Sequence, residues 1–279
     1  MTMPQEALRY ELERATDFAR EAGQILLSVY GTGVEVSLKG VDDPVTVADQ
    51  RANAFLVQEL RRAFPGDAIV AEEGGEGSNP TAAERCWFVD PLDGTKEFIS
   101  QNGEFSVMLG LAIGGRATLG VVYQPVGDRL VRGVVGAGAE LLCGGVTAPL
   151  RVSDVAEPAA LRLVASRSHR PAEIDELVAR LGITQQAQSG SVGLKIGLIA
   201  RQEADLYVHV SDRSSLWDAC GPDAILHAAG GRFTDLAGQP IEYVVHQPRN
   251  RRGIFACNAS AFAAVSGVVH ELGQAAGLV

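Results

Sequence analysis

Along the first half of the chain, the spacing of apolar residues predicts two helices and then a β-rich stretch. Apolar residues recur every three or four positions over 5–30 and over 47–62, which is the spacing of amphipathic helices. Two short apolar runs, 68–71 and 86–89, predict strands. Beyond residue 105, longer apolar runs alternate with glycine and aspartate turns, and this alternation indicates an antiparallel meander.

Strands and helices alternate in the second half, which favours a layered α/β unit. A polar, proline-containing stretch over 149–158 separates this unit from the meander. We therefore predict two parts: residues 1–150, with the antiparallel sheet, and residues 151–279, with alternating strands and helices. The expected strands are 161–165, 205–210 and 253–258, and the expected helices are 171–181, 192–200, 217–229 and 260–276.

The composition is that of a chain that folds around a core. Of 279 residues, 46% are hydrophobic and 21% are charged, a balance that disordered chains lack. Lys and Arg number 24 against 34 Asp and Glu, so the formal net charge is −10. This charge argues against a general nucleic-acid binder and against binding to anionic membranes. It leaves room for one small basic pocket.

The four cysteines and the start of the chain bear on its location. No two of the cysteines form a CxxC pair, so neither a zinc knuckle nor a dithiol redox motif is expected. The first residues lack a basic stretch followed by an apolar run, and no apolar run approaches the ~18 residues of a membrane span. We therefore expect a cytoplasmic protein with no integral membrane segment.

The most informative stretch is 87–95, where an apolar strand leads into two acids three positions apart, Asp90 and Asp93. Pro91 is expected to fix a turn between them. Both carboxylates and the Leu92 carbonyl can then point into one site. Such an all-oxygen ligand set suits a hard cation such as Mg²⁺.

Other acids stand where ligands often lie. Glu72 follows a predicted strand, Asp49 stands near a helix start, and Asp218 opens an apolar helix. Two like charges about 4 Å apart repel by roughly 4 kcal/mol at an effective dielectric constant of about 20. Four converging carboxylates would therefore protonate or separate unless divalent cations neutralise them. Convergence would imply a metal site with more than one ion.

Each acidic segment also has a structural interpretation. Asp42, Asp49 and Asp218 are placed to cap helices, because acids are favoured at helix N-termini. Glu72 and its neighbour fit a solvated turn, and DPLDG (90–94) fits a plain tight turn. The combination and order of the segments, rather than any one of them, favours the metal site.

These segments carry a family resemblance. AEEGG (71–75), DPLDGTKEF (90–98), LWDACGPDAILHAAGG (216–231) and DDPVTVAD (42–49) resemble the motifs of the inositol monophosphatase superfamily, and the resemblance covers nearly the whole chain. Within it, three details resemble the CysQ-type 3′(2′),5′-bisphosphate nucleotidase branch. They are KEF (96–98) followed by NGEF (102–105), SRSH (166–169) and GSVGLK (190–195).

The resemblance implies a fold, a chemistry and a set of roles. The fold would be a layered α-β-α-β-α sandwich of the inositol monophosphatase and fructose-1,6-bisphosphatase type. The enzyme would be a lithium-sensitive phosphatase with about two or three Mg²⁺ ions per site. Metal ligands would be Glu72, Asp90, Asp93, Asp218 and the Leu92 carbonyl. Asp49 and Thr95 would orient and deprotonate the attacking water. The AMP part of the substrate would be held by Ser166, His169, Ser191 and Lys195.

The implied reaction belongs to sulfur metabolism: hydrolysis of 3′-phosphoadenosine 5′-phosphate to AMP and phosphate, with 3′-phosphoadenylyl sulfate as a second substrate. Lys195 and His169 would neutralise the uncleaved phosphate, and Arg167 and Arg213 are further candidates beside the alternative that they are solvated surface residues. An inositol monophosphate or sugar-phosphate substrate remains open, as does an inactive nucleotide-binding protein. The resemblance also makes a homodimer an expectation.

Overall fold

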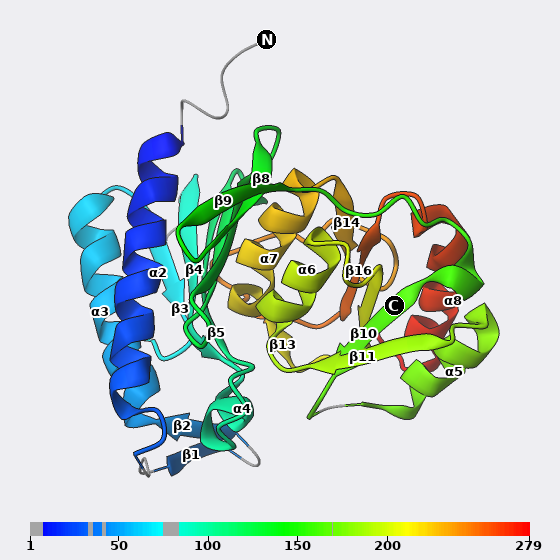
Figure 1. The fold of residues 1–279 in the computed structure, drawn as a ribbon, viewed down its shortest axis with the longest axis horizontal. Helices are drawn as coiled ribbons and strands as arrows, with labels where there is room; N and C mark the ends of the chain where they lie inside the picture. Colours follow the sequence, from blue (N-terminus) through cyan, green and yellow to red (C-terminus); the bar gives the residue numbers. More distant parts are fainter. Residues whose placement is uncertain (1–7, 33–35, 41–42, 75–83, 169) are drawn as a thin grey trace.

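Five layers, helices alternating with sheets, make up the computed structural model (Figure 1), which describes residues 8–32, 36–40, 43–74, 84–168 and 170–279. The expectation of an α-β-α-β-α sandwich is confirmed. Within the described residues, no helix has the length and apolarity that a bilayer crossing needs.

The first sheet has seven strands in the order β3-β4-β5-β6-β7-β8-β9, and all neighbours are antiparallel except β3 and β4. The predicted meander is therefore confirmed. Its strands are β3 (Ala68–Ala71), β4 (Arg85–Asp93), β5 (Ser106–Ile113), β6 (Arg116–Gln124), β7 (Arg129–Val134), β8 (Gly138–Cys143) and β9 (Val146–Leu150). The outer face of this sheet is covered by α2 (Arg9–Val29) and α3 (Val47–Ala63) (Figure 1).

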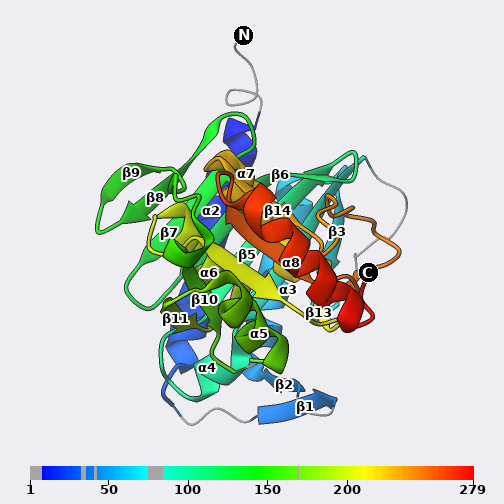
Figure 2. The same cartoon turned by 90° about the vertical axis from the view of Figure 1, so that its right-hand side faces the viewer.

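The second sheet has five strands in the order β11-β10-β12-β16-β14. They are β10 (Arg162–Ser166), β11 (Gln185–Ser189), β12 (Leu206–His209), β14 (Gly231–Thr234) and β16 (Ile254–Asn258). Two helices, α6 (Val192–Ala200) and α7 (Leu216–Ala228), lie between the two sheets. The outer layer is α5 (Ala172–Leu181) and α8 (Phe262–Ala275), which stand in front of the sheet in Figure 2.

Smaller elements connect these layers. A two-stranded hairpin pairs β1 (Val36–Gly40) with β2 (Asp43–Thr46), and the short helix α4 is Thr95–Ile99. The remaining ones are the two-stranded pair β13 (Ser214–Ser215) and β15 (Arg249–Asn250), and the 3₁₀ turn Pro158–Ala160. The seven-stranded sheet ends at Leu150, beside the boundary placed after residue 150, and the division into two parts stays a prediction.

Three hydrophobic clusters hold the layers together, and β4 contributes to two of them. Trp87 and Val89 belong to the cluster under α2 and α3, whereas Phe88 belongs to the cluster around α6 and α7. Side chains of a strand alternate between its faces, so a strand buried on both faces is apolar throughout. The third cluster, which includes Leu177 and Val269, fills the space under α5 and α8.

Glycines let α7 lie directly against the first sheet. A Cβ on Gly120 would stand 2.0 Å from the carbonyl oxygen of Gly221, and one on Gly110 would stand 2.4 Å from the amide nitrogen of Gly221. Side chains at these positions would push the helix outward. The close approach keeps the N-terminus of α7, which carries Asp218, next to the end of β4.

The structure corrects one expectation and adds elements to others. The expected turn at Pro91 is instead an irregular part of β4, which continues to Asp93 with a register shift after Asp90. The polar edge strand β11 and the short β14 were not predicted. In β11 four of five residues are exposed, so it lacks the apolar pattern that marks a strand. Residues 5–7 of the first expected helix lie outside the described residues.

Candidate active site

Four of the predicted metal ligands come together where β3, β4 and α7 meet. Asp90 and Asp93 lie at the end of β4, and Glu72 directly follows the parallel strand β3, where its amide donates to the Val89 carbonyl at 3.0 Å. Asp218 lies in the first turn of α7. Because parallel strands end at the same edge of a sheet, Glu72 and Asp90 are neighbours.

Asp90 is the most constrained of these acids. It is 2% exposed, and its Oδ1 accepts a hydrogen bond from the Leu92 amide at 3.0 Å. Burial, reinforced by the charges of Glu72, Asp93 and Asp218 and by a hydrogen bond with Glu72, raises the pKa of Asp90 well above its usual range.

Asp93 and Asp218 are held by neighbours of different kinds. The Ser191 hydroxyl donates to Asp93 at 2.6 Å and the Gly193 amide donates to it at 3.2 Å. Burial raises the pKa of Asp93, although Lys195 and these hydrogen bonds oppose the effect. Asp218 Oδ2 accepts from the Ser215 amide at 2.8 Å, so the helix-capping interpretation is confirmed for it. Burial and the charges of Asp93 and Glu72 raise its pKa as well.

The donor set of this cluster fits a divalent cation. Throughout the ranges that the structure describes, no three acidic, histidine or cysteine side chains stand as a ready-made metal-ligand group. The carboxylates are nevertheless close enough to raise each other's pKa, and all their donor atoms are oxygens, as hard cations prefer. A cation would offset the repulsion between these carboxylates.

Asp49 and Thr95 meet at the edge of this cluster. Asp49 is buried near the N-terminus of α3, where its Oδ2 accepts from the Thr46 amide at 2.8 Å and from the Thr46 hydroxyl, so it does cap the helix. Its other oxygen faces Thr95, whose hydroxyl lies 3.5 Å from Asp49 Oδ1 and 3.3 Å from the Leu92 carbonyl oxygen. Thr95 opens α4, as expected, and one hydroxyl thus connects Asp49 to a carbonyl of the cluster.

Among the residues predicted to hold the nucleotide, Ser191 lies next to the acidic cluster. Its Oγ donates to Asp93, accepts from the Leu194 amide at 3.1 Å, and lies 2.9 Å from Ser106 Oγ. The backbone of Ser191 has φ of 52°, an unusual conformation for a residue with a side chain. This residue therefore fixes the N-terminus of α6 against the end of β4.

Lys195 is buried beside the same acids. It is 2% exposed, and its Nζ donates to the carbonyls of Gly190 at 3.3 Å and Ser189 at 3.5 Å. It also lies 5.1 Å from the centre of the Tyr207 ring. Burial lowers the pKa of Lys195 to about 8, although the charges of Asp93 and other acids favour its protonated form.

The remaining residues predicted to contact the substrate are Ser166, His169 and Arg213. Ser166 ends β10 and pairs in register with Ser189 of β11. His169 lies outside the described residues. Arg213 is exposed, in keeping with its interpretation as a surface residue.

Two acids that were not predicted from the sequence connect the parts of the site. Glu97, buried in α4, accepts a hydrogen bond from the Ser168 hydroxyl. Glu104 accepts two hydrogen bonds from Arg167, at 2.7 and 2.6 Å, and one from the Gly190 amide at 2.7 Å. Both acids lie in the quoted motifs, but more than 60 residues separate Glu104 from Arg167. A single sequence holds no signal that would pair them.

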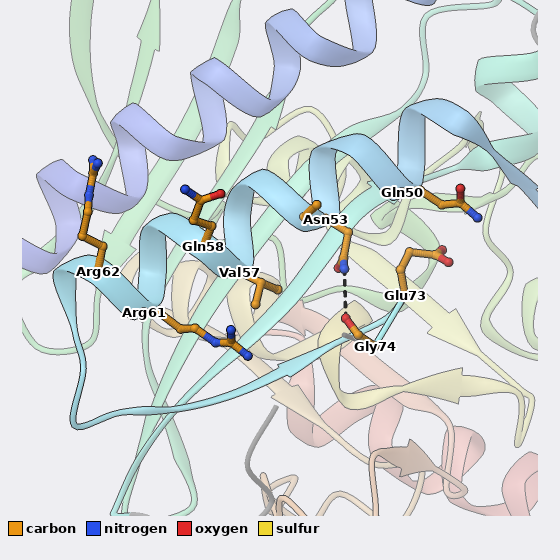
Figure 3. Close-up of a pocket in the computed structure, with 9 residues that line it drawn as sticks. Gln50, Asn53, Val57, Gln58, Arg61, Arg62, Glu73 and Gly74 are labelled. Carbon is orange, nitrogen blue, oxygen red and sulfur yellow. Dashed lines mark hydrogen bonds between the residues drawn. The ribbon is translucent and has the colours of Figure 1, made fainter. Parts of the chain in front are cut away.

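A pocket of about 760 Å³ lies along α3, and Gln50, Asn53 and Glu73 are among the residues that line it (Figure 3). Within it, the Asn53 amide group donates to the Gly74 carbonyl at 2.9 Å. This bond ties the turn that carries Glu72 to the helix that carries Asp49. Asn53 is therefore a further residue that positions the site.

Comparisons with known proteins bear on the family and the fold of the chain. A model of the inositol monophosphatase family matches residues 8–272. The chain is 37% identical over 235 residues to the 3′(2′),5′-bisphosphate nucleotidase CysQ of Escherichia coli (strain K12), covering 83% of this chain and 93% of that protein. The structure of CysQ from Bacteroides thetaiotaomicron, a member of the same family, matches with a TM-score of 0.75 and 30% identity, covering 90% and 97%. A Thermotoga maritima IMPase matches with a TM-score of 0.79 and 26% identity, covering 96% and 99%.

Proposed function

Because the chain belongs to the inositol monophosphatase family, we propose that it is a Mg²⁺-dependent phosphatase acting on 3′-phosphoadenosine 5′-phosphate. The products would be AMP and phosphate, and 3′-phosphoadenylyl sulfate would be a second substrate. One observation carries the proposal: a cluster of acids, buried at Asp90 and partly buried elsewhere, shares Asp93 with a serine and a buried lysine that belong to the predicted nucleotide side.

Glu72, Asp90, Asp93, Asp218 and the Leu92 carbonyl would hold about two or three cations. The bound ions would supply a positive field for the phosphate dianion, acidify the attacking water and stabilise the departing ribose oxygen. The chain's own contribution is to bring the acids together at one end of β4. The cluster is acidic enough to repel a phosphate by itself, so binding of the scissile phosphate depends on cations in the cluster.

Asp49 and Thr95 would handle the proton of the attacking water. The Thr95 hydroxyl donates toward Asp49 or the Leu92 carbonyl, which leaves its oxygen able to accept a hydrogen bond from water. Asp49 then receives the proton through this hydroxyl as general base. Its capping bonds with Thr46 fix the carboxylate in that position.

Ser166, His169, Ser191 and Lys195 would hold the AMP part. Lys195 supplies a positive charge in a buried setting, where an interaction with a phosphate is less screened than at the surface. The overall charge of −10 is no obstacle, because the local field at the phosphate comes from the cations and Lys195.

The cysteines bear on the cellular location that we propose. All four cysteines are free thiols, and three of them are buried, which suits a reducing cytoplasm. We also propose that the chain forms a homodimer, on the basis of its resemblance to the inositol monophosphatase family.

The test is phosphate release from two substrates by the purified chain, with Mg²⁺ and with excess EDTA. We expect strong preference for 3′-phosphoadenosine 5′-phosphate over inositol 1-phosphate, and no release with EDTA. The fold match to the IMPase favours inositol monophosphate as the second candidate, and preference for that substrate would establish it instead. Nucleotide binding without turnover would indicate an inactive binding protein.

A further inference from the structure

Glu104 accepts hydrogen bonds from a set of donors that commonly bind phosphate groups. Its Oε1 accepts from Arg167 Nη2 and its Oε2 accepts from Arg167 Nε, a bidentate pair, and Oε2 also accepts from the Gly190 amide. A guanidinium fork together with a backbone amide is a typical donor set for a phosphate group. In this structure a carboxylate of the protein takes that place.

These donors lie next to the residues proposed to hold the nucleotide. Gly190 directly precedes Ser191, and its carbonyl accepts from Lys195. Arg167 directly follows Ser166, and its amide donates to the Ser189 carbonyl at 3.2 Å. The second, uncleaved phosphate of a nucleoside bisphosphate would need positive donors in this neighbourhood.

Glu104 is charged and well enough held to compete for them. Partial burial favours its neutral form, but the hydrogen bonds from Arg167 and Gly190 outweigh burial and lower the pKa of Glu104 below its usual range. Its side chain is 25% exposed and that of Arg167 is 41% exposed, so the pair is reachable from solvent. A bond of this exposure is weak enough for a ligand to replace.

There is space beside Glu104 for its side chain to occupy after a ligand displaces it. The residue borders a pocket of about 290 Å³ that Ser189, Gly193 and Arg129 also line. The carboxylate can therefore leave Arg167 without being pushed into the core, and two further arginines, Arg129 and Arg201, border the space into which it would move.

We propose that Glu104 is a built-in competitor for the second phosphate of the substrate. In the free protein it holds Arg167 and the 189–191 turn in place, and a phosphate dianion takes Arg167 from it because it carries more charge and more acceptor oxygens. A substrate without a second phosphate leaves the Glu104–Arg167 pair intact and gains nothing from Arg167. Glu104 thus sets a threshold at Arg167, because a ligand that carries less charge than a phosphate dianion would not displace it. This inference rests on the proposed function.

The test uses Glu104→Gln and two substrates that share the scissile bond. 3′-Phosphoadenosine 5′-phosphate has the second phosphate and adenosine 3′-monophosphate lacks it. We expect the substitution to lower KM for the bisphosphate about threefold, the size of a partly exposed ion pair, and to leave kcat and the kinetics of the monophosphate unchanged. If Glu104 only held Arg167 in position for the substrate, its substitution would raise KM for the bisphosphate instead. That result would overturn the proposal.

Three further variants serve as controls for this test. Arg167→Gln removes the contested donor, so adding Glu104→Gln to it should change KM no further; a remaining effect contradicts the proposal. Glu140→Gln breaks another glutamate–arginine pair, with Arg132 on the neighbouring strand, and should leave both substrates unaffected. If Glu104→Gln folds poorly, Glu104→Asp withdraws the carboxylate while keeping its charge, and should lower KM in the same direction. A raised KM in Glu104→Asp counts against the proposal.

Equilibrium binding of AMP without Mg²⁺ separates this inference from the proposed function. AMP carries only the 5′-phosphate, and Glu104→Gln should tighten its dissociation constant about threefold. If the wild type leaves the bisphosphate intact while the variant binds AMP more tightly, the proposed function fails and the inference stands. Equal AMP binding by wild type and variant overturns the inference whatever the activity.

Discussion

Asp90 and Asp205 are both buried aspartates at strands, yet their surroundings differ in every other respect. Asp205 is 0% exposed and Asp90 is 2% exposed. Asp205 accepts hydrogen bonds from Arg162 Nε at 2.7 Å, from Arg162 Nη2 at 2.8 Å and from the Ser153 hydroxyl. Asp90 has one backbone amide and three acidic neighbours.

The partners, not the burial, decide how each group titrates. For Asp205, burial alone would raise the pKa, but the hydrogen bonds from Arg162 and Ser153 outweigh it and the pKa is lowered. For Asp90, burial and like charges act in the same direction and raise it. Asp205 therefore stabilises the second sheet. The charge of Asp90 destabilises the first sheet unless a cation binds. This is how a functional site differs from a structural one of the same composition.

The largest effect is expected from Asp90→Asn. The substitution keeps the volume but weakens attraction for a cation, so the proposed activity should fall by roughly a thousandfold, corresponding to several kcal/mol of lost stabilisation. The metal-free protein should nevertheless gain stability, because a repelling charge is removed. Phosphate release and thermal unfolding with EDTA measure the two effects. Asp154→Asn, on an exposed acid, is the control, and near-normal turnover of Asp90→Asn would remove it from the site.

Asp205→Asn should have the opposite profile. It leaves Arg162 without its carboxylate partner, and breaking such a pair costs about 3 kcal/mol of unfolding free energy. Asp205 lies away from the acidic cluster, so the activity of the folded fraction should be unchanged. Urea unfolding and activity per folded molecule check this. A variant as stable as the wild type would show that the Arg162 pair contributes little.

The pH dependence of metal-free stability should separate the two aspartates in sign. The pKa of Asp90 is higher in the folded state, so the folded form binds more protons and stability falls as pH rises above the unfolded value of about 3.9. The pKa of Asp205 is lower in the folded state, so its contribution is present above that value and is lost as pH falls through the folded pKa. Urea unfolding with EDTA between about pH 3 and pH 8 should show a larger loss in wild type than in Asp90→Asn, where Asp93 and Asp218, whose pKa values are also raised, still contribute. Identical profiles would contradict the assignment.

The smallest effect concerns Lys195. Its pKa is lowered to about 8, so its positive charge is lost as pH rises through that value. KM for the bisphosphate should then rise a few-fold, because one charge-assisted contact of roughly 1 kcal/mol is lost. Lys195→Gln should show a raised KM without this pH dependence. A profile that is the same in wild type and variant would exclude Lys195 from the pocket.

The sequence predicted the layers well because most of them have apolar stripes with a regular period. Helix α3 and the meander from β5 to β8 have such stripes and lie where expected, whereas the largely exposed β9 has none and was not predicted. Strand β11 has four exposed residues out of five, so its pairing with β10 depends on backbone hydrogen bonds that leave no periodic trace. The turn expected at Pro91 was wrong because tertiary contacts of β4 with β5 extend the strand through the proline.

The acids of the candidate site were predicted through their motifs, and their convergence follows from the pairing of β3 with β4 and the close approach of α7. The roles of individual residues stay predictions. Glu104 and Asn53 were missed because their partners, Arg167 and Gly74, are distant in the chain and the contacts exist only after folding.

The most direct test of the acidic cluster is a calorimetric titration of EDTA-treated protein with Mg²⁺ in two buffers of different ionisation enthalpy. We expect saturable binding that releases protons, because carboxylates of raised pKa must give them up to a cation. Asp205→Asn should bind as the wild type does, and Asp90→Asn should bind far more weakly. Absence of saturable binding in the wild type, or equal binding in Asp90→Asn, would contradict the metal site.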